Sequence, residues 1–153
     1  NHSIMKRMIG FFIMIILLLL VGFIKEDNFS AFYSFTKMTL VTTEKLDSMT
    51  EPIISGNQYY YTLENTNENI KLLEDNSFDC YIFYFDIELN ANKLMKNFDY
   101  IYQGGSAQDY LIYYGYYSNF KDYRYVDGKK INFQLAKTAE DWILGFPLIE
   151  TGF

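Results

Sequence analysis

The sequence predicts an α+β protein, in which an N-terminal transmembrane or signal helix is followed by an antiparallel sheet with two helices on one face. Three observations lead to this fold class. The run Met8–Ile24 contains no charged side chain. The rest of the chain is rich in β-branched and aromatic residues, which favour strands, and aromatic residues make up 20% of the whole. Two short segments between the strand candidates have the apolar spacing of helices.

The apolar run Met8–Ile24 is long enough to cross a bilayer. At about 1.5 Å per residue it reaches roughly 25 Å, which is near the short end of what spans the hydrocarbon core. Lys6 and Arg7 precede it, and because the positive flank of a membrane segment stays in the cytoplasm, we expect the rest of the chain outside. Residues 1–24 are therefore expected to form a cytoplasmic tip and a single-pass anchor, or alternatively a signal whose cleavage releases a secreted domain.

The stretch 25–50 is expected to form a stalk that is helical for most of its length. Its apolar residues, beginning with Phe29, Phe32 and Tyr33, are roughly helix-spaced. Against this, the TLVTT run at 39–43 is β-branched, which favours a strand. A proline and a Gly-Asn pair follow the stretch, so the extracytoplasmic α+β domain is expected to occupy 51–153.

Short segments of alternating type follow within 51–153. Asn65 with Glu68 resembles a capping box that opens a helix to Asp75, and Asn90 is suited to cap a second helix that runs to Phe98. Strands and turns are expected as follows: strands at Gln58–Leu63, Asp79–Glu88, Tyr100–Gln103, Tyr110–Tyr117, Tyr123–Val126, Ile131–Lys137 and Trp142–Ile149, and hairpin turns at Asp127–Gly128 and Ala139–Asp141.

One of these strands shows a regular alternation. Ile131, Phe133 and Leu135 alternate with Asn132 and Gln134. Because successive side chains of a strand point to opposite faces, the pattern predicts one buried face and one face in solvent.

The net charge and the numbers of cysteine and histidine residues disfavour several classes of function. The net charge is -6, and from residue 25 onward 11 basic and 19 acidic residues give -8, which disfavours nucleic acid as a partner. The single cysteine, Cys80, excludes an internal disulfide, and inside an apolar strand it is expected to be a small buried hydrophobe. The single histidine, His2, leaves little from which to build a zinc or Ser-His site. We expect no metal and no cofactor.

Clustered tyrosines are the first candidates for a binding site. The candidate ligand-binding residues are Tyr113, Tyr114, Tyr116, Tyr117 and Tyr123. Adjacent strand residues point to opposite faces, so these side chains cannot all lie in the core. Exposed aromatic rings are suited to stacking on sugar rings or peptides. The alternative is compositional, because a sequence rich in Lys, Asn, Ile, Phe and Tyr is what AT-rich coding produces and strands accept tyrosine readily.

Carboxylates supply the enzymatic alternative. Glycoside chemistry needs two of them across a cleft, and the sequence places no two in that relation. The available residues are Asp79, Asp86, Glu88, Glu140 and Asp141. We therefore expect no catalytic residues.

The C-terminal third resembles a known family. The segments YVDGKKINFQLA, from Tyr125 to Ala136, and LGFPLIETGF, from Leu144 to Phe153, resemble the terminal hairpin of the YwmB-like proteins. These are small exported proteins of low-GC spore-forming bacteria, assigned a fold like that of the TATA-box-binding protein. The resemblance implies a curved antiparallel sheet with helices on one face and supplies no catalytic residue. The chain is short for two full repeats of that fold, so a single or degenerate repeat is expected.

Together these observations predict a membrane-anchored binding module of the bacterial cell envelope or of sporulation. Its expected partners are the lipid bilayer, through Met8–Ile24, and an envelope protein or glycan, with no nucleic acid. Two alternatives remain open. One is a cell-envelope hydrolase that acts on glycan or peptide through an Asp/Glu pair, and the other is an anchor that only oligomerises through its strand edges.

Overall fold

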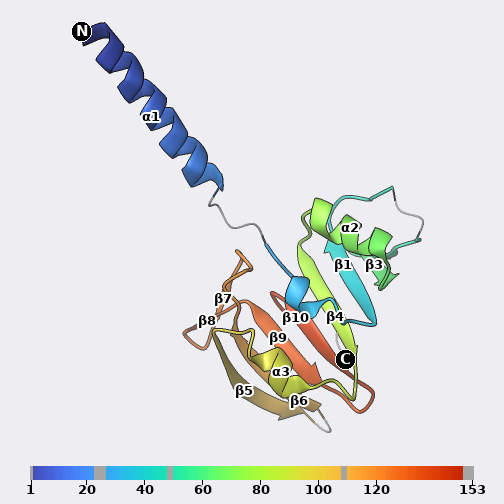
Figure 1. Ribbon diagram of the computed structural model, residues 1–153. Helices are drawn as coiled ribbons and strands as arrows, with labels where there is room; N and C mark the ends of the chain where they lie inside the picture. Colours follow the sequence, from blue (N-terminus) through green and yellow to red (C-terminus); the bar gives the residue numbers. More distant parts are fainter. Residues whose placement is uncertain (1, 23–26, 48–49, 108–109, 150–153) are drawn as a thin grey trace.

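The computed structural model describes residues 2–22, 27–47, 50–107 and 110–149. Helix α1 (His2–Gly22) stands apart from an α+β domain that begins at residue 27 (Figure 1). The stretch His2–Leu19 is long and apolar enough to cross a membrane or to act as a signal sequence, and none of it is buried against the domain. This agrees with an apolar N-terminal helix. Phe23 and Ile24, which end the predicted apolar run, lie outside the described residues.

The domain is built on one large antiparallel sheet, whose strands follow the order β2-β3-β1-β4-β10-β9-β6-β5. A short hairpin is formed separately by β7 (Arg124–Val126) and β8 (Lys129–Ile131). The strands of the large sheet are β1 (Lys37–Thr42), β2 (Ile53–Ser55), β3 (Gln58–Glu64), β4 (Cys80–Asp86), β5 (Tyr100–Ala107), β6 (Tyr110–Tyr116), β9 (Phe133–Lys137) and β10 (Asp141–Phe146).

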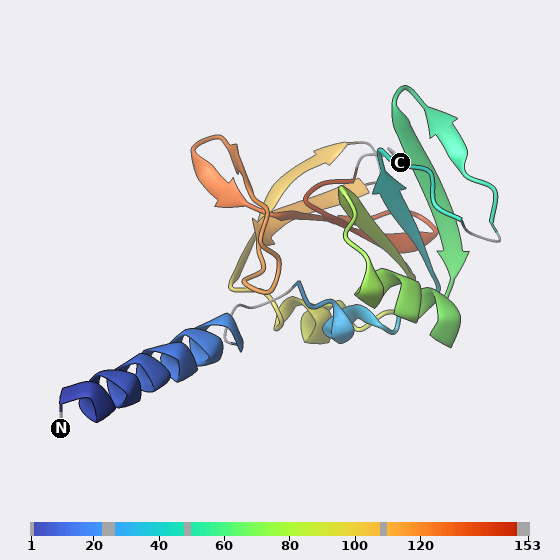
Figure 2. The same cartoon turned by 90° about the horizontal axis from the view of Figure 1, so that it is seen from above.

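Three helical segments cover one face of this sheet, which we call the inner face (Figure 2). They are the 3-10 helix η1 (Ser30–Phe32), α2 (Asn67–Asp75) and α3 (Ala91–Met95). Each places at least one side chain in the same core cluster: Phe32, Leu73 and Leu94. The predicted fold class, an antiparallel sheet with two α-helices on one face, is confirmed.

The helix caps agree with the prediction at one helix and differ at the other. Asn90 caps α3 as expected, since its side chain accepts a hydrogen bond from the backbone N–H of Lys93. The cap of α2 is Thr66, which accepts from the N–H of Asn69, and not Asn65. The Asn65 amide instead donates to the carbonyls of residues 33 and 35, so it ties the segment before β1 to the end of β3.

The prediction of a helical stalk over 25–50 is wrong. Strand β1 lies in this stretch and pairs with β3 on one side and β4 on the other. Met38 and Leu40 point to the inner core, while Val41 packs on the opposite face. Because both faces of β1 are buried, its residues are β-branched and apolar almost throughout. Strand β1 belongs to the domain, so the domain begins at residue 27 and not at 51.

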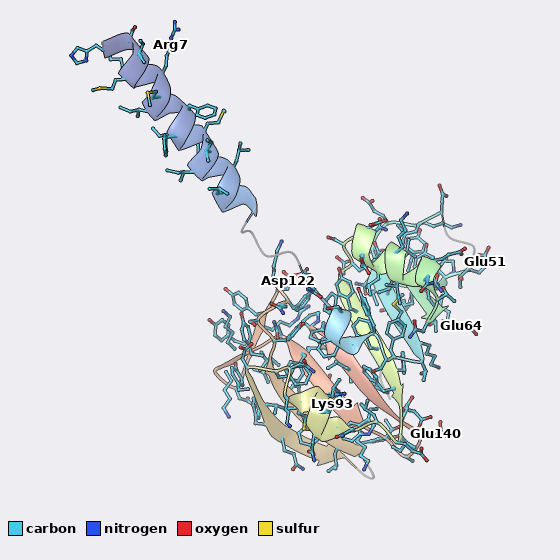
Figure 3. The ribbon with its side chains drawn as sticks, viewed as in Figure 1. Arg7, Glu51, Glu64, Lys93, Asp122 and Glu140 are labelled. Atoms are coloured by element: carbon cyan, nitrogen blue, oxygen red, sulfur yellow. The ribbon has the colours of Figure 1, made fainter. Side chains whose placement is uncertain are left out.

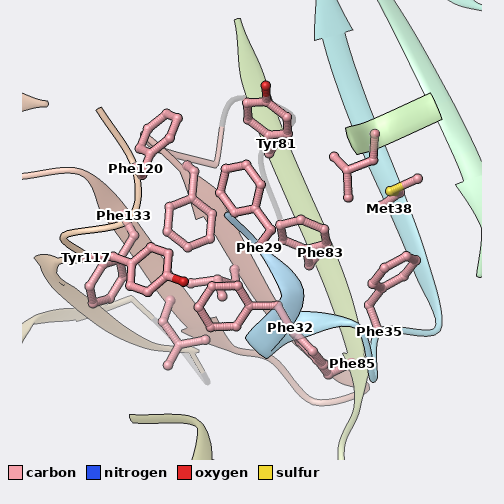
Figure 4. Packing of buried hydrophobic residues seen from close by; sticks show 14 of the residues in the cluster. Phe29, Phe32, Phe35, Met38, Tyr81, Phe83, Phe85, Tyr117, Phe120 and Phe133 are labelled. Atoms are coloured by element: carbon pink, nitrogen blue, oxygen red, sulfur yellow. The ribbon is translucent and has the colours of Figure 1, made fainter. Parts of the chain in front are cut away.

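Aromatic rings fill the core of the inner face (Figure 4). Phe29 and Phe32 reach into it from the start of the domain and contact the ring of Phe146 at centroid distances of 5.1 and 5.4 Å. Next to them, Phe98 lies 5.8 Å from Phe32 and stacks on Phe133 at 3.9 Å. These packed rings bury a large apolar area, which is the main stabilising contribution for a domain of this size.

The opposite, outer face carries a smaller cluster in the middle of the sheet. It consists of small and branched residues: Val41, Cys80, Ile82, Ala136, Ile143 and Ile149. Cys80 is fully buried, as predicted. The last strand ends at Phe146 and not at Ile149, because the chain folds back over this face. Gly145 permits the return, since a Cβ there would lie 2.6 Å from the carbonyl oxygen of Leu148.

Two polar residues that were expected in solvent are buried. Asn132 is fully buried and interrupts the predicted strand Ile131–Lys137 between β8 and β9. Its side-chain oxygen accepts from the N–H of Tyr117, and its amide donates to the carbonyls of Tyr117 and Phe120. Gln134 accepts from the N–H of Ile149. The prediction of a solvent-exposed face is wrong because chain segments distant in sequence cover this face and use the two side-chain amides as hydrogen-bond partners.

Candidate functional site

Pairing between β5 and β6 assembles a row of tyrosines on the outer face. Tyr100 lies opposite Tyr116, and Tyr102 lies opposite Tyr114. The ring centroids of each pair are 6.1 Å apart. These four residues, which we call the tyrosine ladder, point away from the inner core because Gly115, between Tyr114 and Tyr116, faces the core residue Phe133.

A glycine in β5 makes room for one ring of the ladder. A Cβ at Gly104 would lie 2.1 Å from the ring of Tyr114, so a larger residue there would displace that ring. The pairing of β5 with β6 also shifts by one residue between Gln103 and Gly105, as at a β-bulge. Gly104 therefore shapes the aromatic surface.

The β7–β8 hairpin places two lysines over the ladder. The ammonium nitrogen of Lys129 lies 4.1 Å from the ring centroid of Tyr102. That of Lys130 lies 5.0 Å from Tyr116 and 4.2 Å from Tyr123. A cation over an aromatic face at these distances is attracted by the ring quadrupole, so the lysines hold the hairpin against the sheet.

The hairpin turn follows from its two central residues. Asp127 and Gly128 both have positive φ angles, 50° and 77°. This is the backbone of the type I′ turn, for which Asp-Gly is a preferred pair. The predicted turn is therefore confirmed, and the turn fixes which way Lys129 and Lys130 point.

Much of this surface is open to solvent. Tyr100, Tyr123 and Tyr125 are 42%, 50% and 67% exposed, and the other ladder tyrosines are half-buried. Partial burial raises the pKa of Tyr100 and of Tyr102. Their hydroxyls are therefore neutral at physiological pH and can both donate and accept hydrogen bonds.

The structure divides the five tyrosines that the sequence singled out. Tyr114, Tyr116 and Tyr123 lie together on the outer face. Tyr113 packs against the inner core, and Tyr117 is buried there, with its hydroxyl donating to the carbonyl of Asn28 at 2.7 Å. Tyr117 therefore does not belong to the surface, and the alternation of faces within the strand accounts for the division.

Five members of the assembled surface were not among the predicted site residues. They are Tyr100, Tyr102, Tyr125, Lys129 and Lys130. A signal was present, because Tyr100 and Tyr102 have the same two-residue spacing as Tyr114 and Tyr116. That spacing puts each pair on one face of its strand, but the register that brings the pairs together is a long-range property.

The candidate carboxylates lie elsewhere. Asp86 and Asp141 are opposite one another on β4 and β10, and each has a local role. Asp86 accepts from the backbone N–H of Glu88, and Asp141 accepts from the hydroxyl of Thr138. Within the part of the chain that the structure describes, no three His, Cys, Asp or Glu side chains are grouped as metal ligands.

Comparison of the chain with family models, curated proteins and solved structures finds no match. The resemblance to the YwmB-like proteins therefore stays a prediction.

Proposed function

We propose that the protein is a membrane-anchored module that acts by binding and not by catalysis. Helix α1 anchors it, the domain that begins at residue 27 stands outside the cytoplasm, and the tyrosine ladder contacts a protein or glycan of the cell envelope. The observation that carries this proposal is the assembly of exposed and half-buried tyrosines and lysines from β5, β6 and the hairpin on one face.

Tyrosine suits such a surface for physical reasons. Its ring offers a flat apolar face for stacking, and its hydroxyl offers a hydrogen bond at the edge. The ladder rings are held by strand pairing and by the lysines, so little conformational freedom is lost when a ligand binds. Sugar rings and extended peptides both present flat faces with polar edges, which matches this surface.

The anchoring part of the proposal is tested by cell fractionation. Alkaline carbonate extraction of expressing cells, combined with protease added from outside, is expected to give a protein that stays with the membrane pellet and is digested in intact cells. Recovery of a shortened soluble form would show that α1 is a cleaved signal. Protection in intact cells would overturn the topology.

The binding part is tested on insoluble peptidoglycan, with the full-length protein in detergent. The double variant Tyr100→Ala/Tyr116→Ala removes one stacked pair and is expected to weaken co-sedimentation on the order of tenfold, equivalent to about 1.4 kcal/mol. Tyr60→Ala is the matched control, because Tyr60 is half-buried on β3, toward the other end of the sheet, where it packs against the outer-face cluster. Equal binding by all three proteins would contradict a role for the ladder.

The hydrolase alternative makes a different prediction. It requires turnover of glycan or peptide fragments that Asp86→Asn or Asp141→Asn abolishes. We favour binding because both carboxylates are engaged in the turns at the ends of their strands. If the wild-type protein releases soluble fragments and either substitution abolishes this release, the enzymatic proposal replaces the binding proposal.

A further inference from the structure

Positive charge is concentrated in one segment of the acidic domain. Residues 121–130, which we call the basic segment, contain four basic side chains and two carboxylates, for a net charge of +2. The remainder of 25–153 has seven basic and seventeen acidic residues, a net of -10. The basic segment includes the β7–β8 hairpin, and its Tyr125 is the most exposed of the large hydrophobic side chains outside α1 and β2.

Hydrogen bonds fix the basic segment to the point where the domain begins. The backbone N–H of Lys121 donates to the carboxylate of Asp27 at 2.8 Å. Two residues before the basic segment, the carbonyl of Asn119 accepts from the N–H of Asn28 at 2.9 Å. In Figure 1 the hairpin lies on the side of the domain that faces α1, and Figure 3 shows Asp122 on that side.

Chain length then limits how far the basic segment can lie from a bilayer that holds α1. Asp27 is the third residue after Ile24, the last residue of the apolar run, and a fully extended chain covers at most about 10 Å over three residue steps. The headgroup layer on each side of the hydrocarbon core is roughly 5–8 Å thick. Asp27, and with it Lys121, is therefore held at or just above the headgroups.

We propose that the basic segment rests on the surface of the membrane in which α1 is anchored, with its lysines and Arg124 against anionic phospholipid headgroups and Tyr123 and Tyr125 in the interfacial layer. This inference rests on the proposed anchoring by α1. Lysine and arginine near a bilayer are attracted to anionic lipids, and tyrosine is enriched at the membrane interface because one end of its ring is apolar and the other polar. The contact holds the tyrosine ladder close to the membrane.

The test uses the full-length protein in nanodiscs of phosphatidylcholine alone or mixed with phosphatidylglycerol. Trp142→Phe removes the sole tryptophan, whose indole N–H makes no hydrogen bond among the described residues. Tyr125→Trp then places a reporter in the basic segment. Ile54→Trp is the matched control, since Ile54 is 66% exposed and Tyr125 is 67% exposed, and β2 lies six strand spacings, roughly 29 Å, from β6.

Lipids brominated near the headgroup end of their chains should quench about half or more of the Tyr125→Trp emission in anionic nanodiscs and leave Ile54→Trp unquenched. Adding Lys129→Gln/Lys130→Gln should reduce the quenching, whereas Lys71→Gln/Lys93→Gln, on α2 and α3, should not. Absence of quenching at Tyr125→Trp, or equal quenching at Ile54→Trp, in protein that is incorporated into the nanodiscs overturns the inference and leaves the anchor intact. Failure of the wild-type chain to incorporate overturns the anchoring itself, and the inference with it.

Discussion

The two faces of the large sheet use different aromatic residues. The inner face is dominated by phenylalanine rings that contact one another, with Phe32, Phe83 and Phe133 fully buried. The outer face has tyrosines at its β5–β6 end, where the rings stack across strands and receive lysines from the hairpin. The chain contains nearly equal numbers of the two residues, 14 Phe and 15 Tyr. They are separated in part by the face of the sheet on which they lie.

This difference shows which aromatic residues stabilise the fold and which remain available to contact a ligand. A buried tyrosine must satisfy its hydroxyl, and the three fully or nearly buried ones do so. Tyr61 donates to a carbonyl, as does Tyr117, and Tyr81 accepts from the N–H of Phe78. Phenylalanine has no such requirement. Outer-face tyrosines can leave their hydroxyls to solvent or to a ligand.

Removing an inner ring should have the largest effect. Phe32→Ala is expected to lower the free energy of unfolding by about 3–5 kcal/mol, because it deletes a fully buried ring and leaves a cavity. Tyr116→Ala, on the outer face, should cost about 1 kcal/mol or less. Urea unfolding of both variants measures the contrast. Similar losses would show that the outer face contributes to stability as much as the core does.

The buried amide should come next. Asn132→Ala leaves one N–H and two carbonyls of the segment 117–120 without their partner, at a cost of about 3 kcal/mol, given roughly 1–3 kcal/mol for each unsatisfied buried group. Gln134→Ala, which removes one hydrogen bond, should cost about 1 kcal/mol. Equal unfolding midpoints in urea for the two variants would contradict this order.

Exchanging the two aromatic residues sharpens the comparison. Phe83→Tyr places an unpaired hydroxyl in the inner core and should destabilise by about 2 kcal/mol. Tyr116→Phe removes a hydroxyl from the outer face and should change stability by less than about 0.5 kcal/mol. Thermal unfolding followed by circular dichroism tests the pair, and a neutral Phe83→Tyr would mean that the core holds a partner for the added hydroxyl.

A smaller effect appears at high pH. Burial raises the pKa of Tyr81 from its ordinary value of 10 to about 12. Between these values the folded protein keeps the proton and the unfolded chain releases it, so the free energy of unfolding should fall as the pH rises from 10 through 12. Tyr81→Phe should flatten this fall, at a cost of about 1 kcal/mol at neutral pH from the lost hydrogen bond. If the pH profile of the variant is unchanged, titrating groups other than Tyr81 cause the loss of stability at high pH.

The strands with strong local patterns were predictable, and the strand that failed shows why others are not. The segment around Cys80 is β-branched and aromatic almost throughout, and it forms β4 close to its expected bounds. Strand β1 has equally suitable residues, but the helix-like spacing of Phe29, Phe32 and Tyr33 just before it predicts a helix. Those rings instead reach into the core from η1 and its flanks, in a conformation set by contacts with β4 and β10.

The candidate site was predictable only in part for the same reason. The alternation rule correctly separates Tyr114 and Tyr116 from Tyr113 and Tyr117. It does not predict which strand lies beside β6, so it does not identify Tyr100 and Tyr102 as members of the site. The lysines of the hairpin depend on the angle at which it folds over the sheet, and that angle is a tertiary property.

The place of β10 in the sheet has a consequence for folding during synthesis. This strand comes after all the others in the described chain, yet it lies between β4 and β9 and pairs with both. Until it emerges, the strands already made can pair only within two separate halves of the sheet, β2-β3-β1-β4 and β9-β6-β5, each of which would leave an open edge on which another unfinished chain could pair. We expect protease resistance of chains of increasing length to rise in one step when residues 141–146 become available, and a gradual rise would show that the halves fold independently. Completion of the domain is thus delayed until nearly all of it has left the ribosome.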